Sequence, residues 1–95
     1  MTHTKTKTSL YRRAYVAWLI STGINSVPAI MKATGMPRRT AQDTIAAIPE
    51  LSIVLENKGG SYSVVDWGML NKSWLNDNSQ HVRDVLQYPQ DKILD

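Results

Sequence analysis

The stretch ATGMPRRTAQDTI, residues 33–45, decides the fold. A glycine is followed by a methionine, a proline and a run without helix breakers that begins with Arg38 and Arg39. Glycine is favoured just after a helix and proline in the first turn of the next, so the stretch predicts two helices joined by a tight turn. Two cations at a helix N-terminus oppose the helix dipole, at a cost of roughly a few tenths of a kcal/mol. We therefore expect the arginines to meet an anion.

The two helices around this turn have local start and stop signals. Ser26 is a suitable N-cap for a helix that runs to about residue 34, with a proline in its first turn, and Gly35 closes it. The next helix is predicted from residue 37 to about residue 48. It ends there because Pro49 disfavours helical backbone in the residue before it.

The flanking segments predict two more helices and a hairpin. Residues 10–22 contain no glycine or proline, and their apolar side chains cover most of a helical circumference, which predicts a helix buried on more than one side. Residues 51–68 hold two runs rich in β-branched residues around Gly59-Gly60, a strong hairpin signal. Residues 71–88 return to helical spacing, with Pro89 as the stop.

Length and composition indicate one small globular domain. The chain has 95 residues, is 42% hydrophobic and contains no cysteine, which excludes disulfides and thiolate metal sites. No apolar run reaches the roughly 18 residues that span a bilayer, and no signal-peptide pattern is present, so a cytoplasmic location is predicted. Residues 1–8 alternate Thr and Lys and predict a flexible basic arm, residues 9–89 form the domain, and residues 90–95 form a short tail.

The charge is divided unevenly along the chain. Residues 1–42 carry seven basic and no acidic side chains, whereas residues 43–95 carry four basic and eight acidic ones, which gives the formal net charge of +3. Such an asymmetry indicates a side of the molecule that faces a polyanion. The alternative is a chance segregation of solvated charges.

The predicted order is helix, short strand at residues 24–25, helix, helix, strand, strand, helix. This is the order of a winged helix-turn-helix, an α+β fold with a three-helix core and a β-hairpin wing, here with an additional C-terminal helix. SVPAIMKATGMPRRTAQDTIAAI, the hairpin and WGMLNKSWLNDNSQHVRDVLQYP resemble the winged helix-turn-helix family of short, mostly uncharacterised prokaryotic proteins. The resemblance covers about residues 10–89. It implies a transcription regulator that binds DNA, and it supplies neither an operator nor a ligand.

The candidate DNA contacts centre on the helix that begins at residue 37. Arginine reads guanine and glutamine reads adenine through paired hydrogen bonds in the major groove, so Arg38, Arg39 and Gln42 are candidate base readers. Asp43 either accepts from cytosine, orients Arg39 four residues earlier, or faces solvent. Candidate phosphate contacts are Thr40, Lys58 at the hairpin tip, Lys32, Arg13, Arg12, Lys5 and Lys7.

Helices 10–22 and 71–88 carry more apolar surface than a small core needs. A two-fold homodimer through these helices is predicted, which would present two recognition helices to half-sites about one helical turn apart. The alternative is that the last helix folds back on the first helix of its own chain. The predicted interface residues are Tyr15, Trp18, Trp74, Val82, Val85 and Leu86.

No catalytic set, metal site or cofactor motif is found in the sequence. His3 and His81 lack the spacing of metal ligands, and no Ser, His and Asp arrangement stands out. We therefore expect no enzyme activity, no cofactor and no small-molecule ligand. The competing functional interpretation is a winged-helix module that binds protein and not DNA, and the modest net charge favours it.

Overall fold

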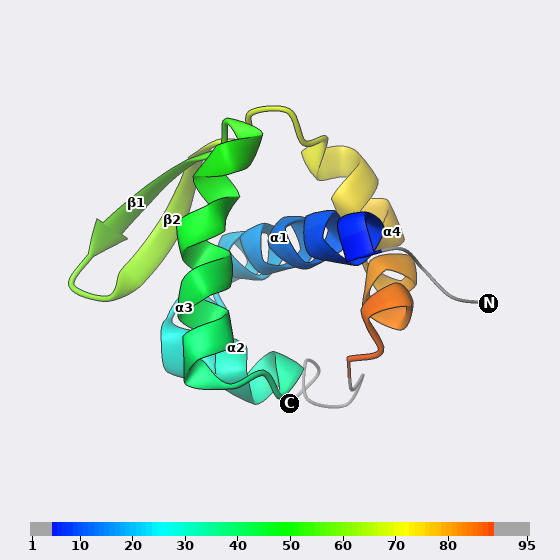
Figure 1. Ribbon diagram of the computed structural model, residues 1–95. Helices are drawn as coiled ribbons and strands as arrows, with labels where there is room; N and C mark the ends of the chain where they lie inside the picture. Colours follow the sequence, from blue (N-terminus) through cyan, green and yellow to red (C-terminus); the bar gives the residue numbers. More distant parts are fainter. Residues whose placement is uncertain (1–4, 89–95) are drawn as a thin grey trace.

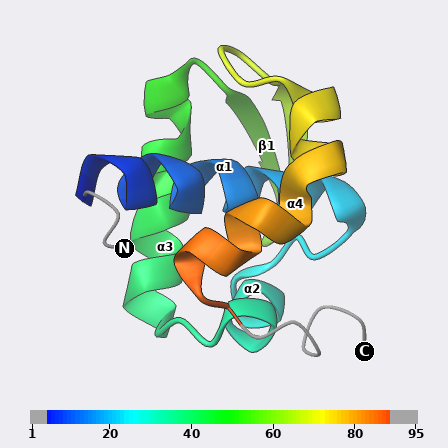
Figure 2. The same ribbon diagram turned by 90° about the vertical axis from the view of Figure 1, so that its right-hand side faces the viewer.

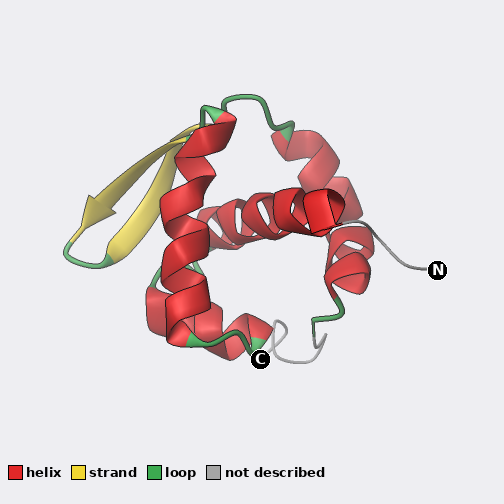
Figure 3. Cartoon of the chain, viewed as in Figure 1, coloured by secondary structure: helices red, strands yellow, loops and turns green. Residues whose placement is uncertain are grey.

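Within residues 5–88, which the computed structural model describes, the helices form the body of the molecule and one β-hairpin lies at its edge (Figures 1 and 3). The predicted α+β class, with a three-helix core, a hairpin and an additional C-terminal helix, is confirmed. The elements are α1 (Lys5–Thr22), α2 (Val27–Thr34), α3 (Arg38–Ala47), the 3₁₀ helix η1 (Ile48–Leu51), β1 (Val54–Lys58), β2 (Ser61–Asp66) and α4 (Lys72–Leu86).

The turn between α2 and α3 is built as the sequence predicts. The Ser26 hydroxyl accepts a hydrogen bond from a backbone N–H in the first turn of α2, and Gly35 ends the helix at φ 79°. Thr34 fixes the turn from inside. Its hydroxyl donates to the Ile30 carbonyl at 2.7 Å and accepts from the Met36 N–H at 3.2 Å. These local bonds set the start of α3.

α3 ends one residue earlier than predicted, and helical backbone continues beyond Pro49. Ile48–Leu51 forms η1, in which the proline lies in the first turn, where its missing N–H leaves no hydrogen bond unmade. Ser52 then adopts a left-handed conformation at φ 62°. The predicted hairpin is confirmed, but its first strand begins at Val54 and not at residue 51.

The hairpin turns at Gly59-Gly60, both at positive φ, as its sequence predicts. Leu55 pairs with Val64 and Asn57 with Tyr62 in an antiparallel register. Because strand side chains alternate, Leu55, Val64 and Tyr62 share one face, and they pack against the core. The short strand predicted at residues 24–25 is not formed, since the described sheet contains only β1 and β2. The Tyr62 N–H nevertheless donates a hydrogen bond to the Asn25 carbonyl at 2.8 Å, which connects the link between α1 and α2 to the hairpin.

α1 lies at the centre of the molecule, as its all-round apolar pattern predicts. It packs against α3, η1 and β2 on some sides and against α4 on another (Figures 1 and 2). Burial of one large aliphatic side chain contributes roughly 1.5–3 kcal/mol, so this helix carries much of the stability. Its buried residues are Ala14, Tyr15, Val16, Ala17, Leu19 and Ile20.

α1 begins earlier than predicted. Residues 5–8, expected to belong to a flexible arm, are helical, which is a correction. The Thr and Lys alternation supplies no apolar anchor, but a helix already nucleated by packing gains one hydrogen bond for each residue it adds. Residues 1–4 of the predicted arm and the tail, residues 90–95, lie outside the described part of the chain.

α4 is capped at its start and bent in its middle. The Asn71 side chain accepts from the Trp74 N–H at 3.0 Å. Asn78 has non-helical backbone angles, φ −119° and ψ 18°, and its side chain donates to the Trp74 carbonyl at 2.8 Å, which produces the bend visible in Figure 2. The helix ends at Leu86 because Gln87 turns left-handed, so Pro89 is not its stop.

α4 folds back on α1 of its own chain, which was the alternative to the predicted dimer interface. Tyr15, Val82 and Val85 are at most 9% exposed within one chain, so they are not available to a partner, and their assignment to a dimer interface is corrected. Trp18 is partly buried and its indole N–H donates to Asn76 Oδ1 at 3.0 Å. Of the six predicted interface residues, only Trp74, at 44%, is exposed, and Leu86 is half-buried.

The α1/α4 contact contains two tyrosines whose ionisation opposes folding. Burial raises the pKa of the Tyr15 and Tyr88 phenols above the ordinary 10.0, and neighbouring Arg83 and Arg12 guanidinium groups offset part of each rise. Well below pH 10 both phenols are neutral in the folded and the unfolded state, so their ionisation does not lower the free energy of unfolding. As the pH rises further the unfolded chain ionises first, and the free energy of unfolding is expected to fall.

Urea unfolding midpoints between pH 8 and 11 test this expectation. The Tyr15→Phe/Tyr88→Phe variant should lose less stability than the wild type over this range, because it lacks both phenols. Equal losses in the two proteins would contradict the assignment.

Candidate nucleic-acid interface

α3 turns one face to the core and the other to solvent, as predicted. Ala41, Thr44 and Ile45 are buried. Because these residues recur at helical spacing, the opposite side of the helix is left uncovered. It carries the exposed residues Arg38, Arg39, Gln42, Asp43 and Ala46.

The start of α3 has no side-chain cap and carries two adjacent arginines. Within the described residues its N-cap, Pro37, makes no side-chain hydrogen bond to the helix, and the first turn contains no acidic residue. The first backbone N–H groups of the helix therefore lack a capping side chain, beside two exposed guanidinium groups. A phosphate or another acceptor placed there gains from both the helix dipole and the arginines.

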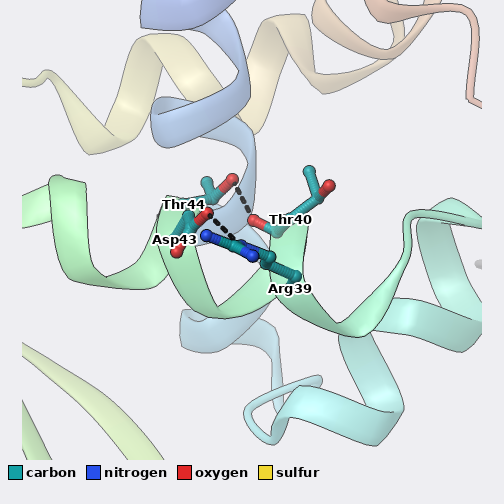
Figure 4. A network of polar contacts seen from close by, with 4 residues as sticks. All are labelled: Arg39, Thr40, Asp43 and Thr44. Atoms are coloured by element: carbon teal, nitrogen blue, oxygen red, sulfur yellow. Dashed lines mark hydrogen bonds and ion pairs between the residues drawn. The ribbon is translucent and has the colours of Figure 1, made fainter.

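Arg39 and Asp43 form the ion pair that their spacing predicts. The Arg39 Nε and the Asp43 Oδ2 are 3.9 Å apart, on side chains 92% and 75% exposed (Figure 4). Such a solvated pair contributes little to stability, about 0–1 kcal/mol. The Thr44 side chain lies on the buried side of α3. Its hydroxyl donates to the Thr40 carbonyl one turn earlier at 2.7 Å, so it is not part of the outer face (Figure 4).

The predicted phosphate contacts are scattered over several elements. Lys58 lies at the hairpin tip with its side chain 82% exposed, but its ammonium is 3.1 Å from the Glu56 carboxylate, so the tip is less basic than the sequence suggests. Lys32 is exposed in the last turn of α2, and Thr40 is half-buried on the side of α3 that faces α1. Arg13 projects from α1 and lies 3.8 Å from Glu50.

An open cavity of about 310 Å³ lies between the N-terminal half of α1 and one flank of α3. The sequence predicts Arg13 and Arg12 as separate phosphate contacts, but it indicates neither Ser9 nor the cavity that these residues line together. No local signal reveals it, because it exists only where α1 crosses α3, about thirty residues further along the chain. Its lining residues are Ser9, Arg12, Arg13, Thr40, Asp43, Thr44 and Ala47.

The other ionisable side chains of residues 5–88 indicate no metal site. His81 is exposed and contacts the Tyr11 ring edge-on, with 6.2 Å between centroids, while His3 lies outside the described residues. Residues 5–88 contain no group of three or more His, Cys, Asp or Glu able to hold a metal ion. In the same range no single helix is long and apolar enough to cross a bilayer, and α1 with α2 reaches that length and composition only as a pair bent by 117°.

Comparison with known proteins agrees with this architecture. A family model described as winged helix-turn helix matches residues 5–86. The crystal structure of a DUF2131 family protein from Shewanella amazonensis SB2B superposes with a TM-score of 0.84 at 29% identity, over 92% of this chain and 91% of that one. No curated protein matches this sequence significantly. The match to the family model agrees with the element order and with the geometry of α2, the turn and α3. The chain therefore belongs to the winged helix-turn-helix family.

Proposed function

We propose that this protein binds double-stranded DNA in a sequence-specific manner, as a small prokaryotic transcription regulator of the cytoplasm. The observation that carries the proposal is the solvent face of α3, where Arg38, Arg39 and Gln42 are exposed beside a helix start without a side-chain cap. In helix-turn-helix proteins the N-terminal part of this helix contacts base edges in the major groove. The family membership supports the same role.

In this arrangement the elements around α3 hold the DNA backbone. The hairpin lies on one side of α3 and the N-terminal turns of α1 on the other (Figure 1). Lys58 at the hairpin tip contacts a phosphate or the minor groove, and Lys32 and Thr40 contact phosphates near the start and flank of α3. Base contacts then specify the sequence while these contacts fix the register.

A second candidate function is binding to another protein. Val54, Val65 and Met69 are 50%, 62% and 70% exposed, on the hairpin and in the loop that follows it. Exposed apolar side chains on a wing suit a protein surface better than a phosphate backbone. Winged helices are able to serve either role, so the binding site and not the fold must decide.

Selection from a random duplex library, at 50 mM and 200 mM salt, tests the proposal. A DNA regulator is expected to enrich one motif and to bind more weakly at higher salt, because each phosphate contact releases counterions with a slope near −0.9. A two-fold motif would support the predicted homodimer, through surface other than buried Tyr15, Val82 and Val85, and a single half-site would support a monomer. Retention of no duplex at 50 mM salt would contradict DNA binding and leave the protein-binding role.

A further inference from the structure

We propose that the cavity between α1 and α3 is a receptor for one phosphate of the DNA backbone. The inference rests on the proposed function and adds a second contact element, α1, to the recognition helix. The basic residues Arg12 and Arg13 line the cavity together with Ser9, Thr40 and Thr44, which carry hydroxyl groups. Arginine is suited to phosphate because its planar fork donates two hydrogen bonds to adjacent oxygens.

The position of the cavity fits a duplex that α3 enters. Thr40, Asp43 and Ala47 line it from one flank of α3, next to the exposed face that holds Arg39 and Ala46. A helix in the major groove, about 12 Å wide, has a phosphate backbone on each side. The hairpin lies on the other side of α3 (Figure 1), and the first turns of α1 extend past α3 (Figure 2). One backbone therefore meets the wing and the other meets α1.

The two arginines are held in place before DNA arrives. Arg12 lies beside the Tyr88 phenol, whose pKa it lowers against the effect of burial. The Arg13 side chain is only 29% exposed and its guanidinium is 3.8 Å from Glu50, which is itself 67% exposed. At 3.8 Å, with the carboxylate largely in solvent, this pair is weak, so a phosphate displaces the carboxylate at little cost. Groups ordered in advance lose less entropy on binding.

Asp43 also lines the cavity, and its carboxylate repels a phosphate. Its charge is shared with Arg39, which lies 3.9 Å away on the outer face. With two arginines and one carboxylate, the lining keeps a formal charge of +1. The Asp43 carboxylate therefore lowers the affinity of the cavity for a phosphate, but the net charge of the lining stays positive. The carboxylate also disfavours the binding of a second anion.

Salt-dependent binding of a 20-base-pair random-sequence duplex tests the receptor. Arg13→Gln is expected to reduce affinity about fivefold to tenfold near 0.1 M salt and to lower the salt slope by about 0.9, since one phosphate contact is lost. The motif enriched in library selection should not change. Arg13→Lys should retain most of the slope, because a point charge still attracts the phosphate.

Glu50→Gln gives the opposite test on an exposed residue. Removal of the competing carboxylate should raise affinity, and by more than Asp77→Asn, which makes the same charge change at an exposed position of α4. Lys72→Gln is the matched control for Arg13→Gln. If wild type binds duplex but Arg13→Gln and Lys72→Gln have equal slopes, the receptor is wrong and the proposed function stands. If wild type binds no duplex, both are wrong.

Discussion

Replacement of Gly68 by alanine is expected to lower the free energy of unfolding by about 3 kcal/mol or more. Gly68 has φ +57°, and a Cβ there would lie 2.3 Å from the Ser52 carbonyl oxygen and 2.6 Å from that of Leu51. Both neighbours are backbone atoms, of the last residue of η1 and of the residue that follows it, and the Met69 N–H donates to the same Leu51 carbonyl at 3.1 Å. To avoid the clash, the loop after β2 would have to move away from η1, and the hydrogen bond from Met69 to Leu51 would break as well.

Gly59→Ala is the matched control for this variant. Gly59 has nearly the same φ, +62°, but among the described residues no atom lies within 4 Å of an added Cβ. Its substitution carries only the backbone cost of a left-handed residue, roughly 1–2 kcal/mol. Urea unfolding of both variants separates the clash from the backbone strain. Equal losses for the two would show that the Gly68 approach to Ser52 is not a constraint.

The double substitution Arg38→Ala/Arg39→Ala is expected to abolish enrichment of a DNA motif while leaving the fold intact. Each bidentate arginine–guanine pair contributes roughly 1–3 kcal/mol of discrimination, so the loss of two corresponds to at least a tenfold effect. Both arginines are exposed, and the single ion pair of Arg39 is solvated. Alanine favours helix and removes cations from a helix start, so the melting temperature should stay equal or rise slightly.

Arg38→Lys/Arg39→Lys separates base reading from charge. Lysine keeps the attraction to phosphate but lacks the planar fork that reads guanine. If the arginines read bases, this variant should retain non-specific duplex affinity and its salt slope, yet lose most of the motif. If it enriches the wild-type motif unchanged, the two residues contact only phosphate, and the base reading proposed for α3 belongs to other side chains.

The sequence by itself determined the helix-turn-helix and the hairpin. Ser26, Gly35 and Gly59-Gly60 act on backbone within a few residues of themselves, and each is found in the predicted role. The period of α3 likewise determined that Arg39 and Gln42 face solvent while Ile45 faces the core. Caps, turn conformations and helical faces follow from local sterics and hydrogen bonding, so they can be read without knowledge of the rest of the chain.

Only the tertiary structure decided what α1 and α4 do with their apolar surface. A stripe of apolar residues on a helix must be covered, but the stripe does not specify whether the same chain or a partner chain covers it. The sequence therefore predicts a partner at Tyr15 and Val82, whereas these residues are buried where α1 and α4 of the same chain pack together. The cavity at Arg13 and the close approach of Gly68 to Ser52 have the same origin. Each depends on the angle and offset at which distant elements pack, and those are set by the summed contacts of the whole core.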